Sequence, residues 1–288
     1  MSAADLASGK GHTDENFPVA SLLLSAEHRP VIMAFYRVAR LADDVADHAS
    51  ATPKVKLKRL AEIEASLTGK SEAVPEARAL RAALAARGLG WEHMLDLLEA
   101  FRRDVTKLRY DSWDELMDYC RYSAAPVGRF LLDVHGEARH AWPANDALCA
   151  ALQVINHLQD CTKDYREIDR VYLPADVMAA HGASVEMLAQ NAAAPAMTAT
   201  INALARKTEA LLAVSRPFAS QVKDLRLAME IGAIQRLAES LTARLRGRDP
   251  LSEETHHTRL EQVGVGLLGI GRTLGERLAS RLSRGLGS

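Results

Sequence analysis

Two aspartate clusters have the residue types and the spacing most suited to chemistry. They are residues 43–47 (DDVAD) and 160–164 (DCTKD), and each lies inside a long helical pattern. Carboxylates four residues apart share one helix face, where they repel each other unless a cation lies between them. Magnesium prefers oxygen ligands of this kind and is usually shared with substrate phosphates. The clusters therefore predict two walls of one cavity that binds magnesium and a diphosphate.

Polar stripes extend both clusters along their helices. The first stripe, at intervals of 4, 3 and 4 residues, consists of Tyr36, Arg40, Asp43 and Asp47. The second, at intervals of 3, 4 and 4, consists of Gln153, Asn156, Asp160 and Asp164. The alternative interpretation is a solvated surface with local ion pairs. Apolar residues flank both stripes, however, and the amide side chains would need hydrogen-bond partners in a plain core, so cavity walls are favoured.

A third feature is residues 119–128 (YCRYSAAPVG), where a proline interrupts a helical pattern. Pro126 removes a backbone donor and kinks a helix, while Gly128 permits the close approach of a ligand or a neighbouring helix. A packing kink and a functional site are equal alternatives at this point. Arg170 follows the second cluster, and its guanidinium matches phosphate oxygens, although surface arginines are common.

Helical periodicity covers most of the chain, and no segment shows convincing strand alternation. The expected helices span residues 26–48, 54–68, 73–87, 91–108, 112–138, 146–168, 196–222 and 225–246, with a turn at 142–145 and a short helix after Pro174. Proline-containing stops at 51–53 and 248–250 separate some of them. This pattern predicts an all-α protein with no linker that would divide it into two domains.

The composition excludes several protein classes. The chain has 288 residues, 48% of them hydrophobic, and a net charge of -1, so we expect a large core but no basic field for nucleic acid. Cys120, Cys149 and Cys161 are expected to be free thiols in a reducing cytosol. The polar N-terminus is unlike a signal peptide, and no apolar run is long enough to span a membrane. We therefore expect a cytoplasmic location.

The chain resembles the squalene/phytoene synthase family. The resemblance rests on residues 35–47 (FYRVARLADDVAD), residues 119–128 and the run from Gln153 to Pro174, in the family's order. Residues 15–21 (ENFPVAS) further resemble the opening of the bacterial hopanoid-pathway branch called HpnC. The resemblance implies an isoprenoid synthase helical bundle with a central active-site cavity, spanning residues 15–250 after a flexible arm at 1–14.

The resemblance also implies roles for individual residues. The metal ligands would be Asp43, Asp47, Asp160, Asp164 and Asn156, and the diphosphate would be bound by Arg37, Arg40, Arg170 and Gln153. Tyr119 and Tyr36 would be catalytic. The prenyl-chain pocket would contain Phe17, Ser123, Ala124, Val127, Gly128, Leu131 and Leu152. The spacing from Asp164 to Arg170 is one residue longer than the family's usual spacing.

The implied activity is magnesium-dependent ionisation of presqualene diphosphate, followed by rearrangement and capture of water to give hydroxysqualene. The alternatives are a presqualene diphosphate or squalene synthase that uses farnesyl diphosphate, and, more remotely, a non-enzymatic assembly factor of the same fold. Residues 264–269 (GVGLLG) fit a dinucleotide-binding pattern, but no strand precedes them, so NADPH is not expected.

The last segment, residues 251–288, is expected to form a tail with a basic amphipathic helix. Leucines at helical spacing alternate with arginines over residues 263–286, a pattern typical of helices that lie in a membrane interface. The alternative is packing on the bundle, which is favoured for residues 263–274. The arginine-rich end, 275–288, is the better membrane candidate. We therefore expect peripheral contact with the inner membrane face, and we expect pathway enzymes as partners.

Overall fold

The structure, a computed structural model, describes residues 25–285 of the chain. The regular elements of these residues are helices, apart from one isolated parallel bridge between Arg109 and Val171. The α-helices are α1 (Arg29–Asp47), α2 (Pro53–Leu67), α3 (Pro75–Ala85), α4 (Glu92–Thr106), α5 (Trp113–Ser123), α6 (Ala125–Val134), α7 (Trp142–Gln159), α8 (Cys161–Ile168), α9 (Ala175–Ala180), α10 (Pro195–Ser215), α11 (Phe218–Gln221), α12 (Leu225–Gly247) and α13 (Arg259–Gly285). Short 3-10 helices are η2 (Arg139–Ala141) and η3 (Val185–Ala189). The predicted all-α class is confirmed. Phe17 and the arm at residues 1–14 lie outside the described residues.

Proline residues and side-chain caps define where many of the helices begin. Proline occupies the first or second position of α1, α2, α3, α6, α7 and α10. A backbone N–H in the first turn has no intrahelical partner, so proline costs no hydrogen bond there. Its fixed φ also suits the first turn. At α12, the Leu227 backbone N–H donates to the Asp224 carboxylate at 2.8 Å. The local sequence therefore explains most helix starts without tertiary contacts.

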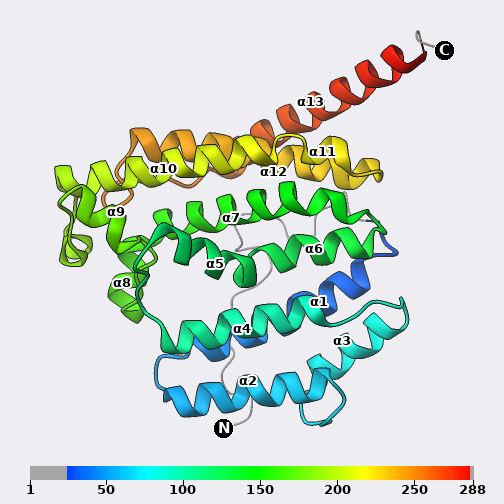
Figure 1. Ribbon diagram of the computed structural model, residues 1–288, viewed down its shortest axis with the longest axis horizontal. Helices are drawn as coiled ribbons and strands as arrows, with labels where there is room; N and C mark the ends of the chain where they lie inside the picture. Colours follow the sequence, from blue (N-terminus) through cyan, green and yellow to red (C-terminus); the bar gives the residue numbers. More distant parts are fainter. Residues whose placement is uncertain (1–24, 286–288) are drawn as a thin grey trace.

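Two of the expected helices that carry site residues are divided in the structure. Residues 112–138 form α5 and α6, which meet at Ala124, because Pro126 removes a backbone donor two residues later. Residues 146–168 form α7 and α8, which meet at Asp160, where ψ is 4°. As a result α8 turns away from α7 at one end of the bundle (Figure 1).

Two further expectations about boundaries are wrong for the same physical reason. Residues 196–222 form α10 and α11 rather than one helix, with Pro217 between them. The turn expected at 142–145 is instead the start of α7, because Pro143 lies in the first turn, where proline is tolerated. Proline marked both places in the sequence, but its local effect depends on whether it begins or interrupts a helix.

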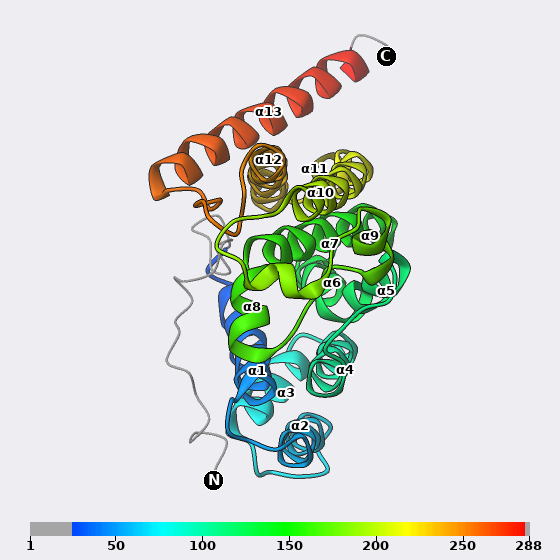
Figure 2. The ribbon, with the colours of Figure 1, turned by 90° about the vertical axis from the view of Figure 1, so that its left-hand side faces the viewer.

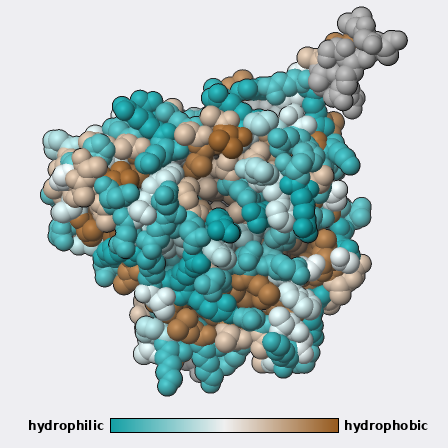
Figure 3. Space-filling model, viewed as in Figure 1, coloured by the Kyte–Doolittle hydropathy of each residue, from teal (hydrophilic) through white to brown (hydrophobic). Residues whose placement is uncertain are grey.

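The helices stack in layers (Figures 1 and 2). Helices α2 and α3 form one outer layer, α1 and α4 the next, α5, α6 and α7 the middle, and α10, α11 and α12 the layer that α13 crosses. One buried apolar cluster joins α1–α4 to the end of α6, and a second joins α5–α7 to α10 and α12. Hydrophilic residues cover most of the face seen in Figure 3. Helices α1 and α7 therefore belong to different clusters, and both contribute walls to the cavities between the layers.

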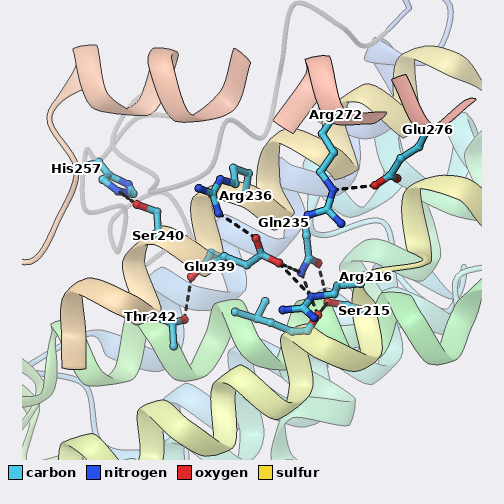
Figure 4. Close-up of polar contacts among 12 residues, drawn as sticks. Ser215, Arg216, Gln235, Arg236, Glu239, Ser240, Thr242, His257, Arg272 and Glu276 are labelled. Atoms are coloured by element: carbon cyan, nitrogen blue, oxygen red, sulfur yellow. Dashed lines mark hydrogen bonds and ion pairs between the residues drawn. The ribbon is translucent and has the colours of Figure 1, made fainter. Parts of the chain in front are cut away.

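Helix α13 is held against α12 by a close glycine contact and against α11 by an arginine. A Cβ added to Gly269 would lie 2.2 Å from the Gly232 carbonyl oxygen, so the two backbones approach more closely than side chains would allow. The Arg277 guanidinium donates to the Ala219 carbonyl oxygen at 2.9 Å. Figure 4 shows further polar contacts nearby, including the Ser215–Gln235 hydrogen bond of 2.6 Å between α10 and α12. Residues 264–269 thus belong to a helix that packs against α12.

Candidate active site

Two cavities lie between the layers, and the first is polar, with a volume of about 270 Å³. Its walls come from α1, α4, α5, α7, α8 and the segment after α8. Its polar lining residues are Asp43, Asp47, Asp104, Tyr119, Ser123, Gln153, His157, Asp164, Arg170 and Tyr172. The structure therefore brings carboxylates of both sequence clusters to one cavity, as the hypothesis of two walls requires.

Four residues predicted to bind the metal or the diphosphate do not line this cavity, namely Asp160, Asn156, Arg37 and Arg40. Asp160 and Asn156 are half-buried near the junction of α7 and α8, while Arg37 is exposed on α1. Asp160 lies at the junction of α7 and α8, where ψ is 4°, so the helix that the spacing argument assumed is not continuous at this residue. Arg37 follows Tyr36 directly, and adjacent helical residues point about 100° apart.

One arginine of α1 pairs with two aspartates of the same helix. Arg40 contacts Asp43, with 3.0 Å between Nη1 and Oδ2, and Asp44, with 2.7 Å between Nη2 and Oδ1. Asp44 is buried beside the cavity wall but does not line the cavity. Arg40 therefore lies next to the predicted diphosphate site while it pairs with two carboxylates of its own helix.

Arg170 joins three walls of the polar cavity. Its guanidinium donates to Asp47 Oδ1 at 3.0 Å, to Tyr172 Oη at 3.2 Å and to the backbone oxygen of Asp104 at 3.0 Å. The side chain is 7% exposed, so these bonds form in a largely dry environment. A planar guanidinium held at three points is fixed in orientation.

A left-handed residue directs Arg170 into this position. Helix α8 ends at Ile168, and Asp169 follows with φ 52° and ψ 37°. This conformation reverses the chain at a helix end and is more accessible to Asp than to most residues. The Asp169 carboxylate pairs with Arg109 at 2.5 Å. The spacing between Asp164 and Arg170 is therefore compatible with both residues lining one cavity.

Asp104 is a buried site residue that the sequence analysis missed. Its carboxylate accepts hydrogen bonds from Tyr119 Oη at 2.9 Å and from Tyr172 Oη at 3.1 Å. Burial raises the pKa of Asp104 to about 6, although the nearby Arg170 opposes the shift. A sequence signal existed, because Leu97, Ala100 and Asp104 follow the spacing of one buried helix face.

The aromatic wall of the cavity is neutral. The His157 ring stacks on the Tyr172 ring with 3.5 Å between centroids, and burial lowers the pKa of His157 to about 3, with Arg170 acting in the same direction. Burial also raises the pKa of Tyr119 well above its ordinary value. These rings therefore offer hydrogen bonds and aromatic faces at neutral pH, without ionisation.

The carboxylates of the two walls form a site that favours a cation. Burial, followed by the charge of Asp47, raises the pKa of Asp43 to about 7. Burial, followed by the charge of Asp160, raises the pKa of Asp164 to about 7. The Asp43 side chain retains 37% of its accessible surface, since that surface opens into the cavity. An added cation would stabilise the ionised forms of both groups.

The donor set fits magnesium that is shared with a substrate. Within residues 25–285, no three acidic, histidine or cysteine side chains already converge on one point that could hold a metal ion. Mg²⁺ commonly takes one or two carboxylates and completes its octahedral shell with water and phosphate oxygens. The Ser123 hydroxyl is also buried without a hydrogen-bond partner in the described part of the chain. The site therefore has polar groups for both an ion and an anionic ligand.

The second cavity, of about 330 Å³, is apolar and adjoins the first. Leu152 lines the apolar cavity and its neighbour Gln153 lines the polar one, so the two meet along α7. The apolar cavity is lined mainly by Ile32, Phe35, Tyr36, Ala39, Val127, Gly128, Phe130, Leu131, Leu132, Leu148, Leu152, Phe218, Leu227, Ile231 and Ile234. Of the residues assigned to the prenyl pocket, Ser123 lines the polar cavity instead, and Ala124 is buried at the α5–α6 junction.

The comparisons with known proteins agree with one another. The family model described as squalene/phytoene synthase matches residues 10–261. A hydroxysqualene synthase from Zymomonas mobilis is 55% identical over 270 residues, which cover 93% of this chain and 91% of that protein. A hydroxysqualene synthase from Rhodopseudomonas palustris is 54% identical over 262 residues, which cover 91% of this chain and 90% of that protein.

Solved structures show the same relationship at the level of the fold. Squalene synthase HpnC from Alicyclobacillus acidocaldarius is similar with a TM-score of 0.72 and 31% identity, and the match covers 85% of this chain and 92% of that one. A dehydrosqualene synthase solved in complex with a ligand has a TM-score of 0.76 at 21% identity, over 95% of this chain and 96% of that one. The bundle thus has known structural counterparts.

Proposed function

The chain belongs to the squalene/phytoene synthase family, and from this premise we propose how its cavities convert presqualene diphosphate to hydroxysqualene. It is an enzyme of squalene and hopanoid biosynthesis, in the class that processes isoprenoid diphosphates. The observation that carries the mechanism is the contact between a carboxylate-lined cavity and an apolar one along α7. Such a pair fits a molecule with a diphosphate at one end and long hydrocarbon chains at the other.

The residues that would hold magnesium are Asp43 and Asp47 on one wall and Asp164 on the other, with Asp160 and Asn156 close to α8. Magnesium bound there together with the diphosphate would neutralise negative charge as the leaving group departs. Gln153 lines the same cavity and offers hydrogen bonds, while Arg40 lies beside Asp43. Arg170 holds Asp47 in place and adds positive charge to the diphosphate end of the cavity.

The walls beyond the diphosphate site would protect the carbocation. Tyr119, Tyr172 and His157 present neutral rings to the polar cavity, and ring faces stabilise nearby positive charge. Tyr36 lines the apolar cavity, two helical turns before Asp43. The apolar residues exclude bulk water from the reacting chains, so that a water molecule held by the protein captures the cation.

The test of this function compares two substrates without any nicotinamide cofactor. Purified protein incubated with magnesium and presqualene diphosphate is expected to give hydroxysqualene, identified by mass spectrometry. Farnesyl diphosphate under the same conditions is expected to give little product. Efficient formation of presqualene diphosphate from farnesyl diphosphate alone would instead assign the first condensation step to this chain.

We also propose that the enzyme works in the cytoplasm and contacts the inner membrane face through α13. Among the described residues, no helix is long and apolar enough to cross a membrane. The outer side of α13 is nevertheless a strip of exposed apolar residues, namely Leu260, Val263, Leu267, Leu268, Leu274, Leu278 and Leu282. The occupant that fits is an anionic bilayer, because α13 has five arginines and two glutamates, a net +3 (5 − 2), whereas the whole chain has a net charge of -1.

Polar replacement of three leucines tests this contact. Leu274, Leu278 and Leu282 are exposed, so changing all three to Gln should leave the fold unchanged. Each interfacial leucine contributes about 1 kcal/mol or more, so the partition coefficient onto anionic liposomes should fall by about a hundredfold. Val214→Gln, which changes an exposed residue on α10, is the matched control. If the triple variant floats with liposomes as well as the unchanged chain does, membrane contact through α13 is contradicted.

A further inference from the structure

One acidic side chain lies in the wall of the apolar cavity. Glu230 of α12 lines this cavity together with the adjacent Ile231 and with Leu227 and Ile234, which lie three residues before it and four after it on the same helix face. Glu230 is only 8% exposed. Among the residues of 25–285 that line the apolar cavity, it is the one that carries an acidic or basic group.

The position of Glu230 contrasts with that of the neighbouring acid on the same helix. Glu239 is half-buried between α10, α12 and α13 and lines neither cavity, and it pairs with Arg236 at 3.3 Å and with Arg216 at 3.5 Å (Figure 4). Glu230, in contrast, contributes a carboxylate to a cavity whose other lining residues are mainly apolar.

The other polar groups of the apolar cavity are poorly suited to accept a proton. The Asn145 amide donates to the Ala125 carbonyl oxygen at 3.3 Å, and its oxygen accepts from the Cys149 thiol at 3.7 Å. Burial raises the pKa of Cys149 to about 12, which keeps the thiol protonated. Tyr36 carries a phenol, which is a weak base. A carboxylate is therefore the suitable proton acceptor in this wall.

We propose that Glu230 holds the water molecule that captures the carbocation and accepts the proton that this water loses. The inference rests on the proposed function, because it concerns the last step of that reaction. The carbon–oxygen bond to the diphosphate breaks, and its electron pair leaves with the diphosphate. After rearrangement, the water oxygen bonds to the cationic carbon and one water proton passes to a Glu230 carboxylate oxygen. Glu230 then returns this proton to the released diphosphate or to solvent.

The placement of this carboxylate would decide between two products. A cation in a wholly apolar cavity loses a C–H proton and becomes a polyene, whereas a cation that meets a bound water becomes an alcohol. A hydrogen-bonding acceptor in the wall anchors the water, and its negative charge stabilises the transition state in which the water becomes positive. Glu230 therefore determines the product, while the polar cavity provides for ionisation.

Glu230→Gln separates these two roles. Diphosphate release from presqualene diphosphate should change by less than about threefold, because the polar cavity is intact. The ratio of hydroxysqualene to C30 hydrocarbons should fall by about tenfold or more, since Gln keeps the shape of the side chain but accepts no proton. Glu239→Gln, on the same helix but outside both cavities, should keep the ratio of the unchanged chain.

The outcomes distinguish this inference from the proposed function. If the unchanged chain makes no hydroxysqualene, the proposed function fails before Glu230 is tested. If it does, and Glu230→Gln gives the same product ratio, the role of Glu230 is overturned. Should the Gln variant lose its helical circular dichroism, Glu230→Asp retains the charge and shifts it by one methylene. A severalfold lower alcohol fraction in that variant would support the inference, and an unchanged fraction would overturn it.

Discussion

Asp43→Asn is expected to lower kcat/KM for presqualene diphosphate by about a hundredfold or more, without loss of helix content. Asp43 lines the polar cavity opposite Asp164, and burial with a neighbouring carboxylate raises its pKa to about 7. Both observations describe a group whose ionised form needs a cation. Asparagine keeps the shape but removes the charge, so the stabilisation of the leaving diphosphate falls.

Two further variants make this result specific. Asp164→Asn should give a loss of similar size, because Asp164 lines the same cavity from the other wall. Asp114→Asn changes an exposed residue in the first turn of α5 and should keep nearly full activity. Activity close to normal in both Asp43→Asn and Asp164→Asn would contradict a site built from two walls.

Arg170→Lys is expected to have the second-largest effect, on activity and stability together. Lysine keeps the charge but has one ammonium group, which reaches fewer of the acceptors that the guanidinium binds on Asp47, Tyr172 and Asp104. The free energy of unfolding should fall by about 2–4 kcal/mol, and misplacement of Asp47 should lower kcat/KM by about a hundredfold. Thermal unfolding and steady-state assays measure the two effects.

A neighbouring arginine provides the control for this substitution. Arg109 pairs with Asp169 close to the same turn, but the two side chains are 37% and 66% exposed and neither lines the polar cavity. Arg109→Lys should therefore change stability by less than about 1 kcal/mol and leave activity nearly unchanged. Equal effects of the two substitutions would mean that Arg170 contributes only a surface charge.

The sequence predicts those parts of the site that lie on straight helices. Asp43 and Asp47 belong to one unbroken helix, so their four-residue spacing translates directly into a shared face. Asp160 does not behave in this way, because the chain changes direction at that residue between α7 and α8. Periodicity alone carries no signal for such a break, since apolar residues continue on both sides of it.

Residues that come from other parts of the bundle were harder to predict. Asp104 follows two arginines and looks like part of a charged helix end, yet tertiary packing places it under Tyr119 and Tyr172. Glu230 interrupts an otherwise apolar face of α12, and only the cavity beside it distinguishes it from a surface acid. In both cases the sequence contained one signal, namely an acidic residue at a position of the helix where the apolar stripe predicts an apolar one.

The central claim is that this bundle ionises presqualene diphosphate and allows one water molecule to capture the cation. The most direct test is a single incubation of the purified chain with magnesium and presqualene diphosphate, without NADPH, in water labelled with oxygen-18. We predict that mass spectrometry will detect hydroxysqualene with one labelled oxygen, together with one equivalent of released diphosphate. Unchanged substrate, or a C30 hydrocarbon as the main product, would contradict the account.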